Sequence, residues 1–255
     1  MLKKIRAYQF LFEELVKRDF KQKYKRTVLG MIWSILSPLL MLSILAAIFG
    51  QFFGRNTPHY IIYVFSGQVV INYFIESTTE GMNALMNNAR IFTKINVPKY
   101  LFLFSKNVSA LINFGIILLI YFAFVFLDGL QFTWKYIFLV YPIVCLILMN
   151  LGIGLILSAL FIFFRDIQYL YRLFTQIVMY GSAVFYNITI LPEKIQEIFY
   201  VNPIFVCITY FRDIVIYGVI PSAVIHAILA IYAFVLLAVG FWIYKKYNYK
   251  FLYYV

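Results

Sequence analysis

The stretch FKQKYKRTVLGMIWSILSPLLM, residues 20–41, decides the class of fold. It begins with a basic cluster that contains Lys23, Lys25 and Arg26, and after this cluster no charged residue occurs until Arg55. About 20 helical residues cross a ~30 Å hydrocarbon core, so an uncharged apolar run of about 18 residues or more is typical of a membrane span. Residues 27–54 are therefore predicted to cross a membrane directly after a basic cluster.

The rest of the chain repeats this pattern. It is 64% hydrophobic and 13% charged, whereas soluble domains have roughly 45–50% and 25%. We therefore predict an all-α polytopic membrane protein with six transmembrane helices within residues 27–246. Apart from the first, the uncharged runs that support this count are 56–75, 107–127, 136–164, 173–192 and 214–244.

The distribution of basic residues predicts the orientation. Residues 1–26 contain nine of the 22 Lys and Arg residues, and nine more lie after the second span, after the fourth span and near the C-terminus. Cytoplasmic flanks collect Lys and Arg, so both termini, including the tail 247–255, are predicted to be cytoplasmic. The net charge of +12 is then explained by the basic residues that orient the chain in the membrane and bind lipid headgroups. It does not indicate a nucleic-acid partner.

Residues 1–26 predict an amphipathic helix that lies in the membrane interface. Basic amphipathic helices bind there with the apolar face buried about 5–10 Å. Two interpretations remain open: a simple topology anchor, or a cuff around the bundle that also contacts a cytoplasmic partner. The apolar face has Leu2, Ile5, Tyr8, Phe12, Leu15 and Val16, and the opposite face has Arg6, Glu13, Lys17 and Lys21.

Two features mark the cytoplasmic end of the second span. Glu76 and Glu80 lie one helical turn apart, and we expect a cap or salt bridges rather than a proton relay, which would need a carboxylate nearer the midplane. Residues 83–99, NALMNNARIFTKINVPK, predict a short polar segment with a helical middle that ends at Pro98. This segment is either a docking element for another protein or a plain connecting loop.

Residues 192–213, PEKIQEIFYVNPIFVCITYFRD, predict an external re-entrant helix pair between the fifth and sixth spans. The uncharged run 198–211 has 14 residues, too few to cross, and Asn202-Pro203 interrupts it. Irregular backbone at membrane depth needs protein or a water-filled cavity around it, which favours a gate over an interfacial ornament. The candidate gate residues are Tyr200, Asn202, Pro203, Arg212 and Asp213, and we expect the last two to pair locally with Glu193, Lys194 or Glu197.

Aromatic residues make up 21% of the chain, including 22 tyrosines. Lipid-facing Phe and interfacial Tyr explain most of them. Tyr63, Tyr73, Tyr171 and Tyr180 lie within predicted spans, where rings lining a corridor would let a sugar polymer slide past. Ordinary packing is the alternative for each one.

The chain has no motif for chemistry of its own. There is no G-x-x-x-x-G-K-[ST] phosphate-binding loop, and the two histidines and two cysteines have no ligand spacing. We therefore predict a transport subunit without metal, cofactor or ATPase site, whose energy comes from elsewhere.

Four stretches resemble the permease subunit of type-2 ABC exporters, and most closely the polysaccharide branch, which exports O-antigen, capsule or teichoic acid. They are VKRDFKQKYKRTVLGMIWSILSPLL, NVPKYLFLFSKNVSALINF, FRDIQYLYRLFTQIVMYGSAVFY and YVNPIFVCITYFRDIVIYG. The resemblance implies an interface helix, six spans and external gate helices. It also implies a homodimer in a bacterial cytoplasmic membrane, with two copies of a separate ATP-binding subunit that bind ATP and Mg²⁺.

Carried over by position, the resemblance makes 83–99 the ATPase coupling segment, with Met86, Arg90, Phe92 and Lys94 as its contact residues. It makes Lys23, Lys25 and Arg26 the hinge between the interface helix and the first span. The expected function is a channel-forming permease that moves lipid-linked polysaccharide outward. O-antigen is the favoured polysaccharide, and teichoic acid and capsule are the other candidates. The alternatives are a type-2 ABC exporter of a small lipid or drug, and an ion-driven membrane transporter.

Overall fold

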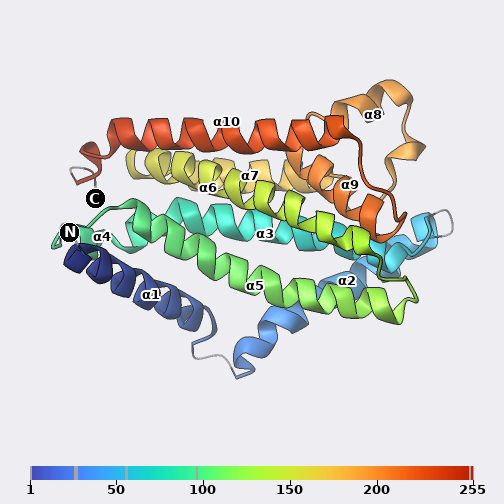
Figure 1. Cartoon of the computed structure of the whole chain (residues 1–255), viewed down its shortest axis with the longest axis horizontal. Helices are drawn as coiled ribbons and strands as arrows, with labels where there is room; N and C mark the ends of the chain where they lie inside the picture. The colour runs from blue at the N-terminus through green and yellow to red at the C-terminus, as the bar shows by residue number, and fades with distance from the viewer. Residues whose placement is uncertain (1, 26–27, 55–56, 96, 253, 255) are drawn as a thin grey trace.

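The computed structural model describes residues 2–25, 28–54, 57–95, 97–252 and 254, and its described part contains helices and no strands (Figure 1). The all-α prediction is confirmed. The α-helices are α1 (Leu2–Tyr24), α2 (Trp33–Phe53), α3 (Tyr60–Asn87), α4 (Ala89–Phe92), α5 (Tyr100–Leu127), α6 (Val140–Phe163), α7 (Ile167–Tyr180), α8 (Glu193–Phe199), α9 (Pro203–Val215) and α10 (Ala223–Tyr247). Short 3-10 helices are η1 (Gly30–Ile32), η3 (Trp134–Leu139), η4 (Ile188–Ile190) and η5 (Lys250–Leu252).

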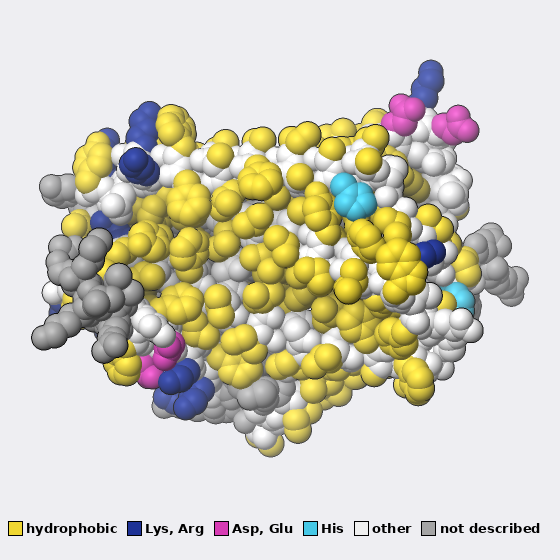
Figure 2. Space-filling model, in the orientation of Figure 1, with side chains coloured by type: hydrophobic (Ala, Val, Ile, Leu, Met, Phe, Trp, Pro, Cys, Tyr) yellow, Lys and Arg dark blue, Asp and Glu magenta, His cyan; other side chains and the backbone are white. Residues whose placement is uncertain are grey.

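Four helical stretches are long and apolar enough to cross a membrane. They are α2, α5, η3 continued by α6, and α10, and in addition α8 and α9 form an apolar pair that is bent by 101°. A broad apolar band covers the middle of the molecule in Figure 2, and the charged side chains gather toward its two ends. Both termini and α4 lie at one end of the bundle, and α8 lies at the other (Figure 1).

The helix α3 occupies the centre of the bundle. Its 28 residues extend about 42 Å at 1.5 Å per residue, and it packs against α2, α5, α6 and α9. Protein rather than lipid surrounds most of α3, so buried polar residues such as Ser66, Gln68 and Ser77 are tolerated within it. This explains why α3 is less apolar than the four strongly apolar stretches although it is as long as α5.

The predicted fifth span, residues 173–192, differs from the structure. The helix α7 has 14 residues and ends at Tyr180, which gives it a length of about 21 Å. Residues 181–186 are turns and bends, and Ala183 has a φ of 48°. Left-handed backbone at a non-glycine residue interrupts a helix. Hydrogen bonds from the Arg212 side chain to the carbonyls of residues 183 and 184 stabilise this irregular segment.

Small residues allow two pairs of helices to approach closely. A Cβ atom on Gly152 of α6 would lie 2.5 Å from the backbone carbonyl carbon of Leu236 in α10, and one on Gly240 would lie 2.5 Å from the Gly152 carbonyl oxygen. A Cβ atom on Gly81 of α3 would lie 3.1 Å from the Cα atom of Gly154. Close backbone contact at small residues is a common way for membrane helices to pack.

We expect Gly152→Ala to lower the stability of the bundle, because the added methyl group forces the backbones of α6 and α10 apart. Overpacking of this kind costs about 1–3 kcal/mol. Gly115→Ala is the matched control, since nothing lies within 4 Å of its added Cβ atom in α5. Thermal unfolding in detergent should show a lower midpoint for Gly152→Ala alone, and equal midpoints would contradict the close α6–α10 contact.

Candidate functional site

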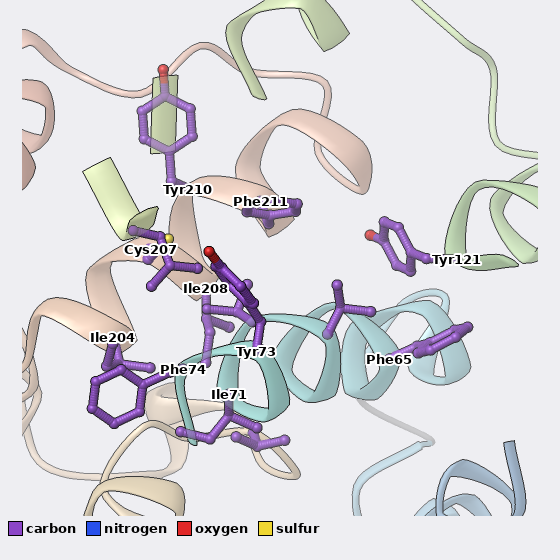
Figure 3. Packing of buried hydrophobic residues seen from close by; sticks show 14 of the residues in the cluster. Phe65, Ile71, Tyr73, Phe74, Tyr121, Ile204, Cys207, Ile208, Tyr210 and Phe211 are labelled. Carbon is purple, nitrogen blue, oxygen red and sulfur yellow. The ribbon is translucent and has the colours of Figure 1, made fainter. Parts of the chain in front are cut away.

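The helix α9 forms the buried half of the bent pair. Its side chains Ile204, Ile208 and Phe211 are at most 2% exposed, and Figure 3 shows them close to residues of α3. Asn202 caps the helix, since its Oδ1 accepts a hydrogen bond from the Ile204 backbone N–H at 3.0 Å, and Pro203 follows at the first helical position, where it is favoured. The Asn-Pro pair that predicted a break therefore begins a buried helix.

The side chain of Arg212 connects α9 to two other segments. Its guanidinium donates to the carbonyl oxygens of Ala183 and Val184, each at 3.0 Å, and to that of Tyr63 at 3.1 Å. The guanidinium carbon lies 3.4 Å from the centre of the Tyr63 ring, and Arg212 is 3% exposed. These contacts satisfy the carbonyl groups of the irregular segment after α7 and compensate for the burial of the charge.

The expected local pairing of Arg212 with an acid of α8 is wrong. Glu193 and Glu197 are exposed, and within the described structure the Arg212 side chain donates its hydrogen bonds to Tyr63, Ser66, Ala183 and Val184. An exposed ion pair is worth only about 0–1 kcal/mol, whereas a buried guanidinium needs several acceptors. The described part of the chain also contains no ion pair between Asp213 and Lys194.

The accessible part of the bent pair is its tip. Tyr200 is 37% exposed and Val201 is 68% exposed, while Ile204 is 2% exposed. The Val201 carbonyl accepts a hydrogen bond from the Tyr232 hydroxyl of α10 at 2.7 Å. The geometry thus separates a fixed base, α9, from an exposed tip formed by α8 and residues 200–201.

Three of the four corridor tyrosines lie inside the bundle. Tyr63 donates to the Tyr186 carbonyl at 3.0 Å, Tyr73 packs on Phe114 with ring centres 4.5 Å apart, and Tyr171 donates to the Thr78 hydroxyl. At 2–6% exposure they cannot line an open path along the surface of this chain, so for them the corridor prediction is wrong and the packing interpretation holds. Tyr180 remains accessible, at 58% exposed.

Ion pairs connect α1, α3 and α5 with one another at the end where both termini lie. Lys23 pairs with Glu76 at 2.6 Å, and Lys106 pairs with Glu80 at 2.9 Å. These contacts confirm the predicted salt bridges of the two carboxylates. Asp19, only 6% exposed, accepts from Arg18 at 2.7 Å and lies 3.5 Å from Lys106.

The sequence interpretation missed Arg18, Asp19 and Lys106. A usable signal was present, because Asp19 lies at helical spacing after Leu11 and Leu15, on the face of α1 that packs against the bundle. Of the three predicted hinge residues, Lys23 makes the ion pair described above and Lys25 is exposed. Arg26 lies outside the described residues.

The predicted coupling contacts divide into buried and accessible residues. Phe92 of α4 is 5% exposed and packs against the Phe102 ring at 6.0 Å, and Met86 is partly buried against the same cluster. They stabilise the cluster that also contains Leu15, so Phe92 is not available to a docking protein. Arg90 and Lys94 are exposed.

A multi-pass helical membrane protein is the class that these spans and buried contacts define. The chain belongs to the ABC-2 type transporter family, since the family model with that description matches residues 11–216. It is thus the membrane subunit of a transporter.

Curated relatives match over most of their length. Two from Klebsiella pneumoniae, each named O-antigen export system permease protein RfbA, are 29% and 27% identical over 247 residues, or 95% of both chains. A relative of the same name from Myxococcus xanthus is 25% identical over 227 residues, which is 88% of this chain and 86% of that relative.

We expect Arg212→Gln to loosen α9, because three carbonyl groups lose their donor and each unsatisfied buried group costs about 1–3 kcal/mol. Cys207 of α9 is a free thiol at 0% exposure, so its labelling by a maleimide reports the opening of α9. In a Cys145→Ala background, labelling should be at least about tenfold faster in Arg212→Gln.

Lys194→Gln, which removes an exposed charge at the same end of the bundle, is the matched control and should label like the parent. Equal labelling rates in Arg212→Gln and its parent would show that Arg212 does not hold α9 in place.

Proposed function

We propose that this chain is the channel-forming permease of an ATP-driven exporter that moves lipid-linked O-antigen polysaccharide out across the cytoplasmic membrane. The match to O-antigen export permeases over 95% of both chains carries the proposal. A match of this extent covers the α8–α9 pair as well as the spans, so it supports a shared transport role and not only a shared membrane fold.

The proposed topology has six crossings, with both termini cytoplasmic and α1 at the cytoplasmic interface. The length of α3 supports its role as the second crossing. We assign the fifth crossing to α7 together with the irregular segment that follows it. The basic residues near both termini support the orientation, and the position of α8 at the opposite end then makes the bent pair external.

The proposed assembly contains two copies of this chain and two ATP-binding subunits, which bind ATP and Mg²⁺. Large apolar areas on the flank support contact with a second copy or with lipid, since Leu173 and Ile177 of α7 are 64% and 71% exposed. For the ATP-binding subunit we propose a docking surface on α4 and the residues after it. This surface consists of Arg90, Lys94 and Ile95, which is 54% exposed.

Deletion of the gene in its own host tests the function. We expect the strain to lose O-polysaccharide from the cell surface and to accumulate the lipid-linked form inside, because synthesis continues while export stops. Surface labelling and extraction of lipid-linked material measure the two pools, and a plasmid copy of the gene should restore export. A normal surface polysaccharide in the deletion strain would reject the proposal in favour of another transported lipid or drug.

We expect Arg90→Glu with Lys94→Glu to abolish export while the protein remains folded, because both side chains are exposed and the change reverses the charge of the proposed docking surface. Export in the complemented deletion strain and co-purification with the ATP-binding subunit measure the effect. Lys245→Glu with Lys246→Glu in α10, also exposed, is the matched control at the same end. Normal export by the α4 variant would leave only the plain-loop interpretation of residues 83–99.

We expect a cysteine at Val201 to crosslink two copies of the chain and to block export, since this residue lies at the exposed tip of the proposed gate. A cysteine at Val206, which is 0% exposed, should not crosslink. The two native cysteines are buried, so background crosslinking should be low. Absence of crosslinks at Ile198, Tyr200 and Val201 alike would place the tip away from the dimer axis.

A further inference from the structure

A cavity of about 560 Å³ opens between α2, α3 and α5 on the side of the bundle that bears α1. In Figure 1, α2 runs at an angle to α3 and α5, away from the tightly packed helices. Ligand pockets commonly measure about 300–1,000 Å³. A second cavity of about 560 Å³ beside α1 shares Lys23 and Glu76 with the first, so the two adjoin at this ion pair.

Polar side chains from three apolar helices converge on the first cavity. Polar groups within membrane spans are costly and commonly mark a substrate path or a water-filled cavity. The described part of the chain provides no hydrogen-bond partner for the Ser37 hydroxyl or for the half-buried side-chain amide of Asn72. The polar residues that line the cavity besides Lys23 are Ser34 and Ser37 of α2, Asn72 and Glu76 of α3, and Asn113 of α5.

The charge of this cavity disfavours an anionic ligand. Among its described lining residues the charged ones are Lys23 and Glu76, which pair at 2.6 Å. Asn113 donates to the other Glu76 oxygen at 2.8 Å. Among these described residues a phosphate group would therefore meet a carboxylate, and the one cation is already paired with that carboxylate.

The same groups match a neutral sugar. Sugar hydroxyls both donate and accept hydrogen bonds, as do the amides and hydroxyls in this cavity, and the Glu76 carboxylate adds a strong acceptor. Trp33, which is 43% exposed and also lines the cavity, offers a flat apolar ring for the C–H face of a pyranose.

We propose that this cavity is a sugar-binding subsite, in which Trp33, Ser37 and Asn72 contact uncharged pyranose units of the polymer near the cytoplasmic end of the path. The inference rests on the proposed function. It adds that the uncharged sugar units are the part of the substrate that binds in this cavity.

Intrinsic fluorescence can test this subsite directly. The chain has three tryptophans, and the other two, Trp134 and Trp242, are 70% and 62% exposed. The full chain with Trp134→Phe and Trp242→Phe, in nanodiscs with its ATP-binding partner, therefore has Trp33 as its one indole, and the same preparation with Trp33→Phe added gives the background emission of the partner and the scaffold protein. The probe is the host's own O-polysaccharide after cleavage from its lipid, and inorganic pyrophosphate is the anion probe.

We expect a saturable change in Trp33 emission with polysaccharide and none with pyrophosphate. Asn72→Leu should weaken polysaccharide binding at least tenfold. The matched control is Asn83→Leu, because Asn83 lies on the same helix and bonds to the Thr79 carbonyl outside the cavity. Ser37→Ala provides a second variant should Asn72→Leu fail to fold, and its control is Ser43→Ala, whose hydroxyl bonds to the Leu39 carbonyl.

The subsite is rejected if polysaccharide produces no saturable change, if pyrophosphate produces an equal one, or if the folded cavity variants bind as tightly as their controls. Export by the variant with Trp134→Phe and Trp242→Phe, measured in the deletion strain, separates rejection of the subsite from failure of the proposed function. Normal export without a Trp33 response rejects the subsite alone. A deletion strain with normal surface polysaccharide rejects the proposed function itself.

Discussion

The contact of the Arg212 guanidinium with three backbone carbonyls is the interaction on which the end of the bundle that bears α8 depends. Residues 183 and 184 are outside any helix and are 0% exposed, so their carbonyl groups need donors from the protein. The guanidinium needs acceptors because it is buried. The guanidinium donates the hydrogen bonds that these carbonyls need, and the carbonyls accept the hydrogen bonds that the guanidinium needs. Because of this pairing α7 can end at Tyr180 and α9 can pack inside the bundle beside α3.

The same interaction determines which parts can move. A helix held by buried hydrogen bonds and by Asn202, which donates to the Gly181 carbonyl at 3.0 Å, is a rigid base, whereas α8 and residues 200–201 are exposed. Gly67 permits the approach of α3, since a Cβ atom there would lie 2.9 Å from Val184. The helix α3 then continues without interruption past Glu76 and Glu80 to Asn87, and Asn88 separates it from α4, so one helix runs from the base of the proposed gate to the residue before the proposed docking surface.

The amino-acid sequence predicts what depends on local pattern and leaves open what depends on distant partners. Uncharged runs indicated the apolar helices, and Asn202-Pro203 indicated the break. Arg212 could not be assigned because its acceptors lie 28 to 149 residues away, and nothing in the sequence predicts which carbonyls are free. Phe92 illustrates the same difficulty, since a lone aromatic in a short segment fits a partner protein and its own core equally well. For the same reason the sequence leaves both the corridor and the packing interpretation open for Tyr63, Tyr73 and Tyr171.

Polar residues in the spans divide into two groups by their partners. Asn107 donates to the Ser77 hydroxyl at 2.6 Å, and Tyr171 donates to Thr78; contacts of this kind connect neighbouring helices and leave no capacity for a ligand. Asn72 lies one residue before Tyr73, so on the same helix it projects to another side, where it lines a cavity. Polarity within a membrane helix is therefore a weak sign of a transport path by itself, because internal hydrogen bonds explain much of it. Polarity that stays unpartnered beside a cavity is the stronger sign, since its cost is offset only when water or a substrate occupies that space.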